Sequence, residues 1–230
     1  MNDPLPKNLA SLDDPERLST FDTALLERSP DPELEHLVAQ AARVSSFPIA
    51  LVSLVVNQIQ FFRAHTGLPP ELVASLATDR CNSFCQYVVA GTAPLRIEDA
   101  LLEPALPTDL VQRYGIRAYV GFPMRVAQRT VGSFCVIDVK PGRLEPRQLE
   151  ELERLTQAAS ARLEMLARKW APPANAADEQ SHRAWMAVAE AQSLASLSEQ
   201  FASGKLSFEE FQRGLGALAT LAGRFPSQGG

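Results

Sequence analysis

Hydrophobic residues recur every three to four positions in two stretches near the start of the chain. Asp14-Pro15 precedes the first stretch and Asp31-Pro32 precedes the second. Asp followed by Pro is a helix start, because Asp caps the free backbone amides and Pro suits the first turn. The apolar spacing after Asp31-Pro32 predicts a helix over about residues 32–46.

The pattern changes to a continuous apolar run in FPIALVSLVV, residues 47–56. A β-branched run without polar alternation predicts a buried strand. The turn Asn57-Gln58 then leads into a second strand, IQFFRAHTG. Residues 94–98 predict a short strand, and residues 117–140 predict two long strands joined at about Ala127–Arg129.

Gly121 and Gly132 lie inside the two long strands, which predicts bulges or a close backbone approach. Residues 68–90 predict two short helices around a loop, and Gly115 predicts the end of another helix. From Pro146 to Trp170 the apolar positions alternate by three and four residues, which predicts a long helix with a heptad seam.

Four regions follow from these patterns. Residues 1–13 are rich in Pro and Asp and predict a flexible N-terminus, and residues 14–170 predict one domain. Residues 171–180 have the composition of a linker. Residues 181–224 predict a helical hairpin, in which Ser207-Phe208-Glu209-Glu210 is a capping box.

The composition narrows the possible partners. The 230 residues carry a net charge of −5 and no long basic run, which argues against nucleic acid or an anionic membrane as the main partner. No apolar run reaches the roughly 18 residues that span a bilayer. The first residues lack the apolar core of a signal peptide, so we expect a cytoplasmic protein.

The element order is helix, two strands, short helices, strand, helix, two strands and long helix. The fragments IQFFRAHTGLPPE, SFCQYVV, PLRIEDA, AYVGFPMRV and TVGSFCVIDVKPGRLEPRQLEEL follow one another in this order. Together they resemble the bacterial GAF domain of the sensor type, over about residues 15–168. The resemblance implies an α+β fold, with a six-stranded antiparallel sheet, helices on both faces and a small-molecule pocket on one face.

The resemblance also implies which residues surround the pocket. They are Phe62, Phe84, Cys85, Tyr87, Asp99, Tyr119, Phe122 and Phe134. Pockets are mostly apolar with a few polar groups, and Asp99 and the tyrosine hydroxyls fit that role. The alternative is that these aromatic residues fill two hydrophobic layers of an ordinary core.

Family members often form dimers through a bundle of their terminal helices. The resemblance, together with the heptad seam, therefore predicts a homodimer. The dimer helix would use Leu149, Leu152, Ala159, Leu163 and Leu166.

The segment RCNSFCQYVVAG, residues 80–91, contains Cys81 and Cys85 four positions apart. Residues at i and i+4 share a helix face. Cys135 lies in a predicted strand and the histidines are scattered, so we expect no metal site. Arg80 would lower the pKa of Cys81, which leaves redox sensing by Cys81 and Cys85 open. The alternative is that both thiols are wall residues.

Two branches of the GAF family use cysteine chemistry. Tetrapyrrole-binding members attach the chromophore to a cysteine followed by histidine, whereas Cys85 and Cys135 precede Gln86 and Val136. Members that reduce free methionine sulfoxide carry cysteines in glycine-rich loops. We therefore expect no cofactor, and a reductase-like enzyme stays an alternative.

The sequence thus predicts a regulatory protein that is not an enzyme and has no catalytic residues. It would sense a small ligand, scaffold a dimer, or both, and pass the signal to a separate partner protein. The alternatives are an interaction scaffold without a pocket and a thiol-based redox sensor.

Overall fold

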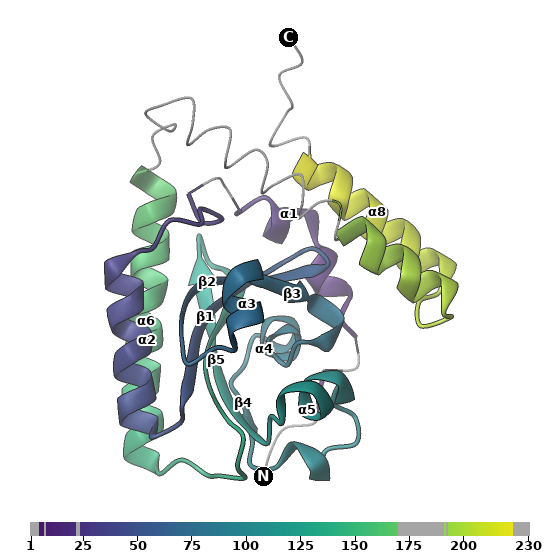
Figure 1. The fold of residues 1–230 in the computed structure, drawn as a ribbon. Helices are drawn as coiled ribbons and strands as arrows, with labels where there is room; N and C mark the ends of the chain where they lie inside the picture. Colours follow the sequence, from purple (N-terminus) through teal and green to yellow (C-terminus); the bar gives the residue numbers. More distant parts are fainter. Residues whose placement is uncertain (1–4, 7, 22–23, 170–190, 192, 223–230) are drawn as a thin grey trace.

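The computed structural model describes residues 5–222, apart from residues 7, 22–23, 170–190 and 192. Its centre is a six-stranded sheet in the order β3-β2-β1-β6-β5-β4, with antiparallel neighbours (Figure 1). The strands are β1 (Ile49–Val56), β2 (Ile59–Thr66), β3 (Ala77–Asp79), β4 (Leu95–Ile97), β5 (Ala118–Val126) and β6 (Arg129–Asp138). The predicted α+β fold is confirmed.

Long helices cover one face of the sheet and short helices cover the other (Figure 1). The helices are α1 (Pro15–Leu18), α2 (Pro32–Ser45), α3 (Pro70–Ser75), α4 (Cys85–Gly91), α5 (Thr108–Tyr114), α6 (Pro146–Lys169) and α8 (Phe208–Ala222), with 3₁₀ helices η1 (Ala10–Asp13), η2 (Arg80–Asn82) and η3 (Ala100–Leu102). The long pair, α2 and α6, packs against β1, β2 and β5. The short helices α3, α4 and α5 lie on the opposite side.

Each face of the sheet has its own hydrophobic core, because successive strand residues point to opposite faces. The helix-pair core lies under α2 and α6 and includes Val52, Phe134 and Leu163. The short-helix core lies under α4 and includes Leu51 and Cys135, which are the sequence neighbours of Val52 and Phe134. The short-helix core is the face that carries the candidate site.

An ion pair ties α2 to α6. The Asp31 carboxylate caps α2 by accepting a hydrogen bond from the Leu34 amide at 3.0 Å. It also accepts from the Arg162 guanidinium of α6, with Nη2 2.8 Å from Oδ2. Asp31 is 4% exposed, so this contact joins the two helices inside their interface.

The two glycines of the long strands are required by close approach. A Cβ at Gly132 would lie 2.0 Å from the Ser53 carbonyl oxygen, and one at Gly121 would lie 2.3 Å from the Tyr119 hydroxyl. The register of β5 and β6 shifts between Met124 and Arg125. The close approach is therefore confirmed at both glycines, and the irregularity lies elsewhere in β5.

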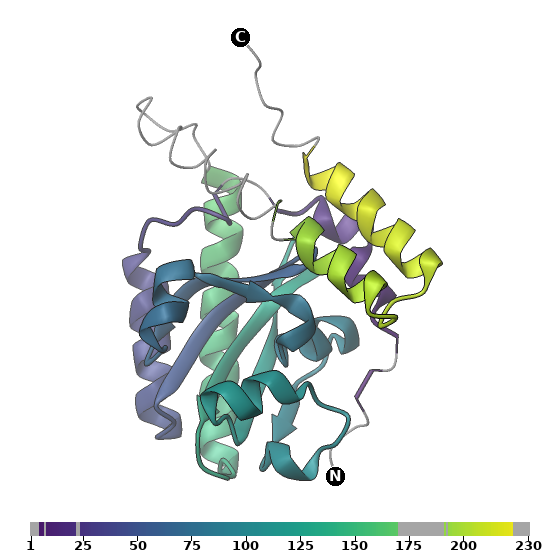
Figure 2. The same ribbon diagram turned by 45° about the vertical axis from the view of Figure 1, so that its right-hand side comes forward.

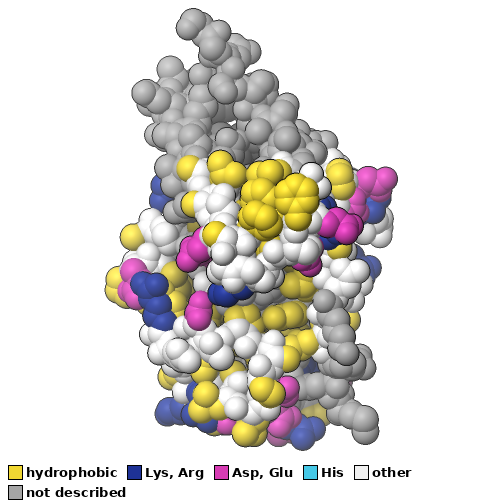
Figure 3. Space-filling view, turned by 90° about the vertical axis from the view of Figure 1, so that its right-hand side faces the viewer, with side chains coloured by type: hydrophobic (Ala, Val, Ile, Leu, Met, Phe, Trp, Pro, Cys, Tyr) yellow, Lys and Arg dark blue, Asp and Glu magenta, His cyan; other side chains and the backbone are white. Residues whose placement is uncertain are grey.

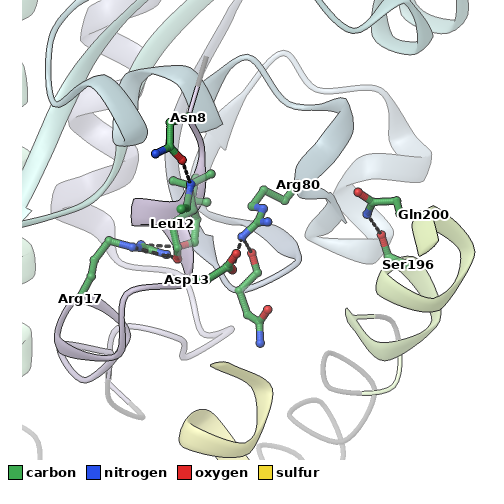
Figure 4. Close-up of polar contacts among 10 residues, drawn as sticks. Asn8, Leu12, Asp13, Arg17, Arg80, Ser196 and Gln200 are labelled. Carbon is green, nitrogen blue, oxygen red and sulfur yellow. Dashed lines mark hydrogen bonds and ion pairs between the residues drawn. The ribbon is translucent and has the colours of Figure 1, made fainter. Parts of the chain in front are cut away.

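Part of the segment expected to be a flexible N-terminus packs on the domain. Leu12 of η1 is fully buried in the short-helix core. Asp13 accepts a hydrogen bond from Arg80 Nη1 at 2.6 Å, and Arg17 donates to the Leu12 and Val55 carbonyls (Figure 4). These contacts fasten residues 8–18 beside the β1–β2 turn.

Two antiparallel helices follow α6 in the chain and lie next to α1 (Figure 2). The first includes residues 193–202 and the second is α8. The capping box is confirmed, since the Ser207 amide donates to Glu210 Oε2 at 2.7 Å and the Glu210 amide donates to Ser207 Oγ at 3.2 Å. The predicted linker, residues 171–180, lies outside the described residues, as do residues 181–190, 192 and 223–224 of the predicted hairpin.

The hairpin, defined here as residues 193–222, has an inner and an outer face. Leu197 is fully buried, and a Cβ at Gly214 would lie 2.6 Å from it, so the two helices touch there. Phe201 and Phe208 are 39% and 61% exposed, respectively. Figure 3 shows hydrophobic side chains gathered near the top of this side of the molecule, where the hairpin lies. The outer face is thus an exposed aromatic surface.

Candidate functional site

The candidate site is a cavity of about 360 Å³ on the short-helix side of the sheet. β1 and β2 form its floor, and α3 and α5 form its walls. We call it the β1–β2 cavity. Its lining consists of Pro48, Ile49, Leu51, Gln60, Phe62, Gly67, Leu68, Pro69, Leu72, Thr78, Leu110, Tyr114, Ile116, Ile137 and Val139. Hydrocarbon and aromatic groups dominate this lining, as they do in small-molecule pockets.

The polar side of the β1–β2 cavity is built by neighbouring strands. Gln60 of β2 and Thr78 of β3 are directly opposite each other in the antiparallel pair. Side chains of opposite residues lie on the same face. Gln60 is 4% exposed and donates from Nε2 to Cys85 Sγ at 3.4 Å. Gln60 therefore lines the cavity and also contacts the buried core.

A pair of buried thiols lies next to Gln60. The Sγ atoms of Cys85 and Cys135 are 3.8 Å apart. The Tyr119 hydroxyl donates to Cys85 Sγ at 3.4 Å and lies 3.0 Å from Ser133 Oγ. This cluster joins α4 to β5 and β6 by polar contacts inside an otherwise apolar core.

The two thiols have opposite pKa shifts. Burial raises the pKa of Cys85, but hydrogen bonds with Cys135 and Tyr119 outweigh burial and lower it to about 6. The pKa of Cys135 is raised well above its ordinary value by burial and by the neighbouring Cys85. The Cys85 thiol is therefore the more acidic member of the pair.

The sequence grouped Cys81 with Cys85, and the structure gives Cys85 a different neighbour, Cys135. Cys81 lies in η2, half-buried, with its Sγ 3.6 Å from Asn82 Oδ1. The prediction that Cys81 has a lowered pKa is wrong, because burial and the nearby Asp79 raise the pKa of Cys81. Arg80 has little effect on the pKa of Cys81, because its guanidinium donates to the Asp13 carboxylate and to the Asn57 carbonyl at 2.7 Å.

Five of the residues assigned to the pocket by family resemblance lie on the cavity side. Phe62 lines the β1–β2 cavity. Phe84, Cys85 and Tyr119 are buried in the core beneath it, and Tyr87 is half-buried against that core. Phe84 and Tyr119 meet edge to face with ring centroids 5.6 Å apart. These four residues support the cavity without lining it.

Three of the assigned residues lie elsewhere. Phe122 and Phe134 are paired across β5 and β6 and belong to the core under α2 and α6, on the opposite face of the sheet. Asp99 caps η3 and forms an ion pair with Arg117, with Oδ2 2.6 Å from Nη2. Their assignment to the pocket is therefore corrected.

Most residues that line the cavity were not predicted from the sequence. Strand alternation could have indicated one of them, Gln60. Gln60 is two positions from Phe62, so both side chains point to the same face of β2. A buried amide in an apolar strand is itself unusual. Leu72, Leu110 and Ile116 carry no comparable signal, because loop geometry brings them to the cavity.

The predicted dimer seam of α6 packs inside its own domain. Leu152, Ala159 and Leu163 are at most 1% exposed, and Leu149 and Leu166 pack against the same core. The heptad spacing is thus explained by contacts with α2 and the sheet. A homodimer would need a different surface, and it stays a prediction.

Among the described residues, no helix is both long and apolar enough to cross a membrane. The described part of the chain also contains no group of three His, Cys, Asp or Glu side chains arranged to hold a metal ion.

Comparisons with known proteins agree with the observed fold. A model of the GAF domain family matches residues 29–164. A cyclic di-GMP phosphodiesterase of Pseudomonas aeruginosa is 36% identical over 146 residues, which are 62% of this chain and 24% of that protein. The chain therefore spans about a quarter of that relative.

Solved structures share the fold at low sequence identity. The GAF domain of an Acinetobacter phosphoenolpyruvate-protein phosphotransferase superposes with a TM-score of 0.52 at 17% identity, covering 72% of this chain and 95% of that one. The red/green cyanobacteriochrome NpR6012g4 superposes with a TM-score of 0.50 at 13% identity, covering 60% of this chain and 99% of that one.

Proposed function

The chain belongs to the GAF domain family of signalling and sensory domains, and from this premise we propose that the β1–β2 cavity binds a small regulatory ligand. The observation that carries the proposal is the enclosure of an apolar cavity by two weakly anchored helices. A ligand acts by binding one conformational state better than another. The two helical walls of this cavity have no fully buried residue, so a ligand could shift them.

The weak anchoring of the walls follows from their contacts. Neither α3 nor α5 has a fully buried residue. Each ends in a left-handed residue, Leu76 with φ 53° and Gly115 with φ 66°. Helices with few buried apolar contacts open at low free-energy cost. Ligand contacts with Leu72 and Leu110 would hold both walls on the sheet.

We propose that this domain acts by binding and has no catalytic step. The residues that line the cavity include no thiol, imidazole or carboxylate. Cys85 and Tyr119, which lie in the core beneath it, are 2% and 1% exposed and are hydrogen-bonded to each other. A nucleophile needs access to its substrate, and these groups lie beneath the floor of the cavity.

The proposed output is a contact with a partner protein through the hairpin. Its outer face carries three neighbouring phenylalanines, in which Phe201 stacks on Phe211 at 4.6 Å and meets Phe208 at 6.1 Å between ring centroids. Exposed aromatic clusters are typical of interaction surfaces. The named relative is a phosphodiesterase that this chain matches over 24% of the relative's length, and we propose a separate signalling protein as the recipient of the signal.

A second candidate function is a dithiol switch, and the 3.8 Å separation of the Cys85 and Cys135 sulfurs favours it. Hydrogen peroxide would accept two electrons and two protons from the two thiols, giving two water molecules and one S–S bond. The mass of the intact chain before and after treatment with hydrogen peroxide, an oxidant small enough to reach buried thiols, tests this. A loss of two hydrogens that a Cys135→Ser variant does not show would support the switch, and an unchanged mass would exclude it for that oxidant.

The ligand proposal is tested by exposing the full chain to a metabolite extract, re-isolating it and measuring its mass under native conditions. We expect a retained small molecule, and no such molecule on a Leu72→Trp variant whose cavity is filled. A chain that retains nothing and gains no thermal stability from the extract would instead support a scaffold without a functional pocket.

A further inference from the structure

The chemistry of the cavity lining specifies the class of ligand. We infer that the β1–β2 cavity takes an uncharged, mainly apolar molecule with a hydrogen-bonding group at one side. The inference rests on the proposed function, because it presumes that this cavity is the ligand site. It excludes phosphates, carboxylates and nucleotides as occupants.

Charge is the first argument. The side chains that line the cavity include no Lys, Arg, His, Asp or Glu. An anion placed there would lose hydration without gaining a counter-charge, which strongly disfavours its binding. A cation faces the same cost. An uncharged ligand avoids it.

The charged residues of a neighbouring hollow do not change this conclusion. That hollow shares Thr78, Leu110 and Tyr114 with the cavity and adds Asp109 and Arg113 of α5. These two charges have opposite signs. The Arg113 guanidinium lies 5.3 Å from the ring centroid of Tyr114, on which it stacks. The rim therefore offers polar contacts without selecting one sign of charge.

The polar group of the ligand is placed by Gln60 and Thr78. An amide carries two N–H donors and one carbonyl acceptor, and the bond to Cys85 uses one of the donors. The Thr78 hydroxyl both donates and accepts. A hydroxyl, carbonyl or amide on the ligand would match this pair. The rest of the ligand would be hydrocarbon or aromatic, because the remaining lining, which includes Phe62, Leu72 and Ile116, is mainly apolar.

Size limits the ligand further. Ligand pockets commonly have volumes of about 300–1,000 Å³, and the β1–β2 cavity has about 360 Å³. It fits a body of one to three rings, or a short branched chain. A dinucleotide would extend far outside it.

Two fluorescent probes of nearly the same shape test the charge argument on the full chain. N-Phenyl-1-naphthylamine is neutral, and 8-anilinonaphthalene-1-sulfonate adds one sulfonate. We expect the neutral probe to bind the cavity at least tenfold more tightly. The cavity contribution is the part of the signal lost in Leu72→Trp, and Leu101→Trp serves as the matched control because Leu101 is 61% exposed outside the cavity.

The outcomes separate the inference from the proposed function. Equal affinity of both probes, with both lost in Leu72→Trp, would overturn the neutral ligand while keeping the cavity as a ligand site. Binding of either probe that Leu72→Trp leaves unchanged, or no binding, would overturn both. Preference for the neutral probe that is lost in Leu72→Trp and kept in Leu101→Trp is the result that supports the inference.

A second pair of probes tests the polar side. 2-Naphthol and naphthalene differ by one hydroxyl, and one net hydrogen bond corresponds to a preference of about two- to tenfold for the naphthol. Thr78→Val has nearly the same shape as the wild type and removes the hydroxyl. We expect the preference to fall by about that factor in Thr78→Val. An unchanged preference would overturn the role of Thr78 in binding the polar group.

Discussion

Asn57 combines a backbone conformation that suits Asn with a buried side chain whose amide has no hydrogen-bond partner in the described structure. It occupies the β1–β2 turn with φ 52°, a value that Asn tolerates better than most residues. Its side chain is 0% exposed, and neither amide atom has a hydrogen-bond partner in the described structure. A buried polar atom without a partner costs about 1–3 kcal/mol. Asn57 therefore destabilises the region where the hairpin meets the domain.

We predict that Asn57→Gly raises the free energy of unfolding by about 1 kcal/mol, because it removes the unpaired amide and Gly accepts the positive φ. Gln128→Gly is the matched control, since Gln128 has φ 64° and is exposed. Urea denaturation of both variants measures the difference. A gain no larger than that of Gln128→Gly would contradict the cost assigned to the buried amide.

The lowered pKa of Cys85 predicts how the free energy of unfolding depends on pH. The folded pKa of Cys85 is lowered from 9.0 to about 6, so between these values the unfolded chain binds more protons. Stability therefore rises with pH across this window and is lost as pH falls toward the folded pKa. The equilibrium constant for folding changes by at most tenfold per pH unit.

We predict that Cys85→Ser abolishes this rise in stability, and denaturation midpoints measured across the window test the prediction. Cys81→Ser is the control, because burial raises the pKa of Cys81. A wild-type chain whose stability is flat or falls over the window would show that burial dominates at Cys85 and that the hydrogen bonds do not stabilise the thiolate.

Among the elements, α2 and α6 depend on one contact between them. Burial raises the pKa of Asp31, but hydrogen bonds from Arg162 and the Leu34 amide outweigh it and lower the pKa below 3.8. The charged Asp31 thus contributes stability at neutral pH, and this contribution is lost as pH falls through the folded pKa. The contact positions the whole helix pair behind the sheet.

We predict that Asp31→Asn lowers the free energy of unfolding by about 2 kcal/mol at neutral pH, because a hydrogen bond to a charged group is worth about 1.5–3 kcal/mol. Asn keeps the helix cap, so the loss reports the ion pair. Glu33→Gln is the control, since Glu33 also contacts Arg162, at 3.2 Å, but is exposed. Equal losses in both variants would contradict the special role of Asp31.

Elements with local start and stop signals were predictable from the sequence. Asp31-Pro32 begins α2, and Gly115 ends α5 with φ 66°. Both signals act within one helical turn, so a single sequence contains them. The fold followed from such signals together with the order of the strands and the family resemblance.

The site was less predictable because it depends on pairing between distant residues. Cys85 and Cys135 are 50 positions apart in the chain, and β3 is too short to show a pattern. The face of Phe122 was within reach, since it is three positions from Tyr119 in one strand, and an odd spacing places two residues on opposite faces. The family pattern alone does not distinguish the two faces of the strand.

At the scale of the whole molecule, the hairpin contacts the domain at Asp79, where the carboxylates of Asp79 and Glu199 repel each other. Burial and the neighbouring Glu199 raise the pKa of Asp79, and a hydrogen bond with Ser196 only partly offsets them. Because the folded pKa is raised, the protonated acid favours the docked hairpin. Docking is therefore strongest at low pH and weakens as pH rises through the pKa of Asp79.

We predict that Glu199→Gln strengthens docking at neutral pH. The amide hydrogens of residues 193–202 should exchange about two- to fivefold more slowly than in the wild type, as expected for one partly exposed charge contact. Glu209→Gln is the control, since Glu209 is exposed on α8. Faster exchange in Glu199→Gln would contradict the repulsion between the two carboxylates.

The most direct test of the central claim, that a ligand in the β1–β2 cavity holds its two helical walls, is hydrogen exchange of the full chain with and without saturating N-phenyl-1-naphthylamine. We predict slower exchange in α3 and α5, with no change in the Leu72→Trp variant. Unchanged exchange in both walls, or protection confined to the hairpin, would contradict the account.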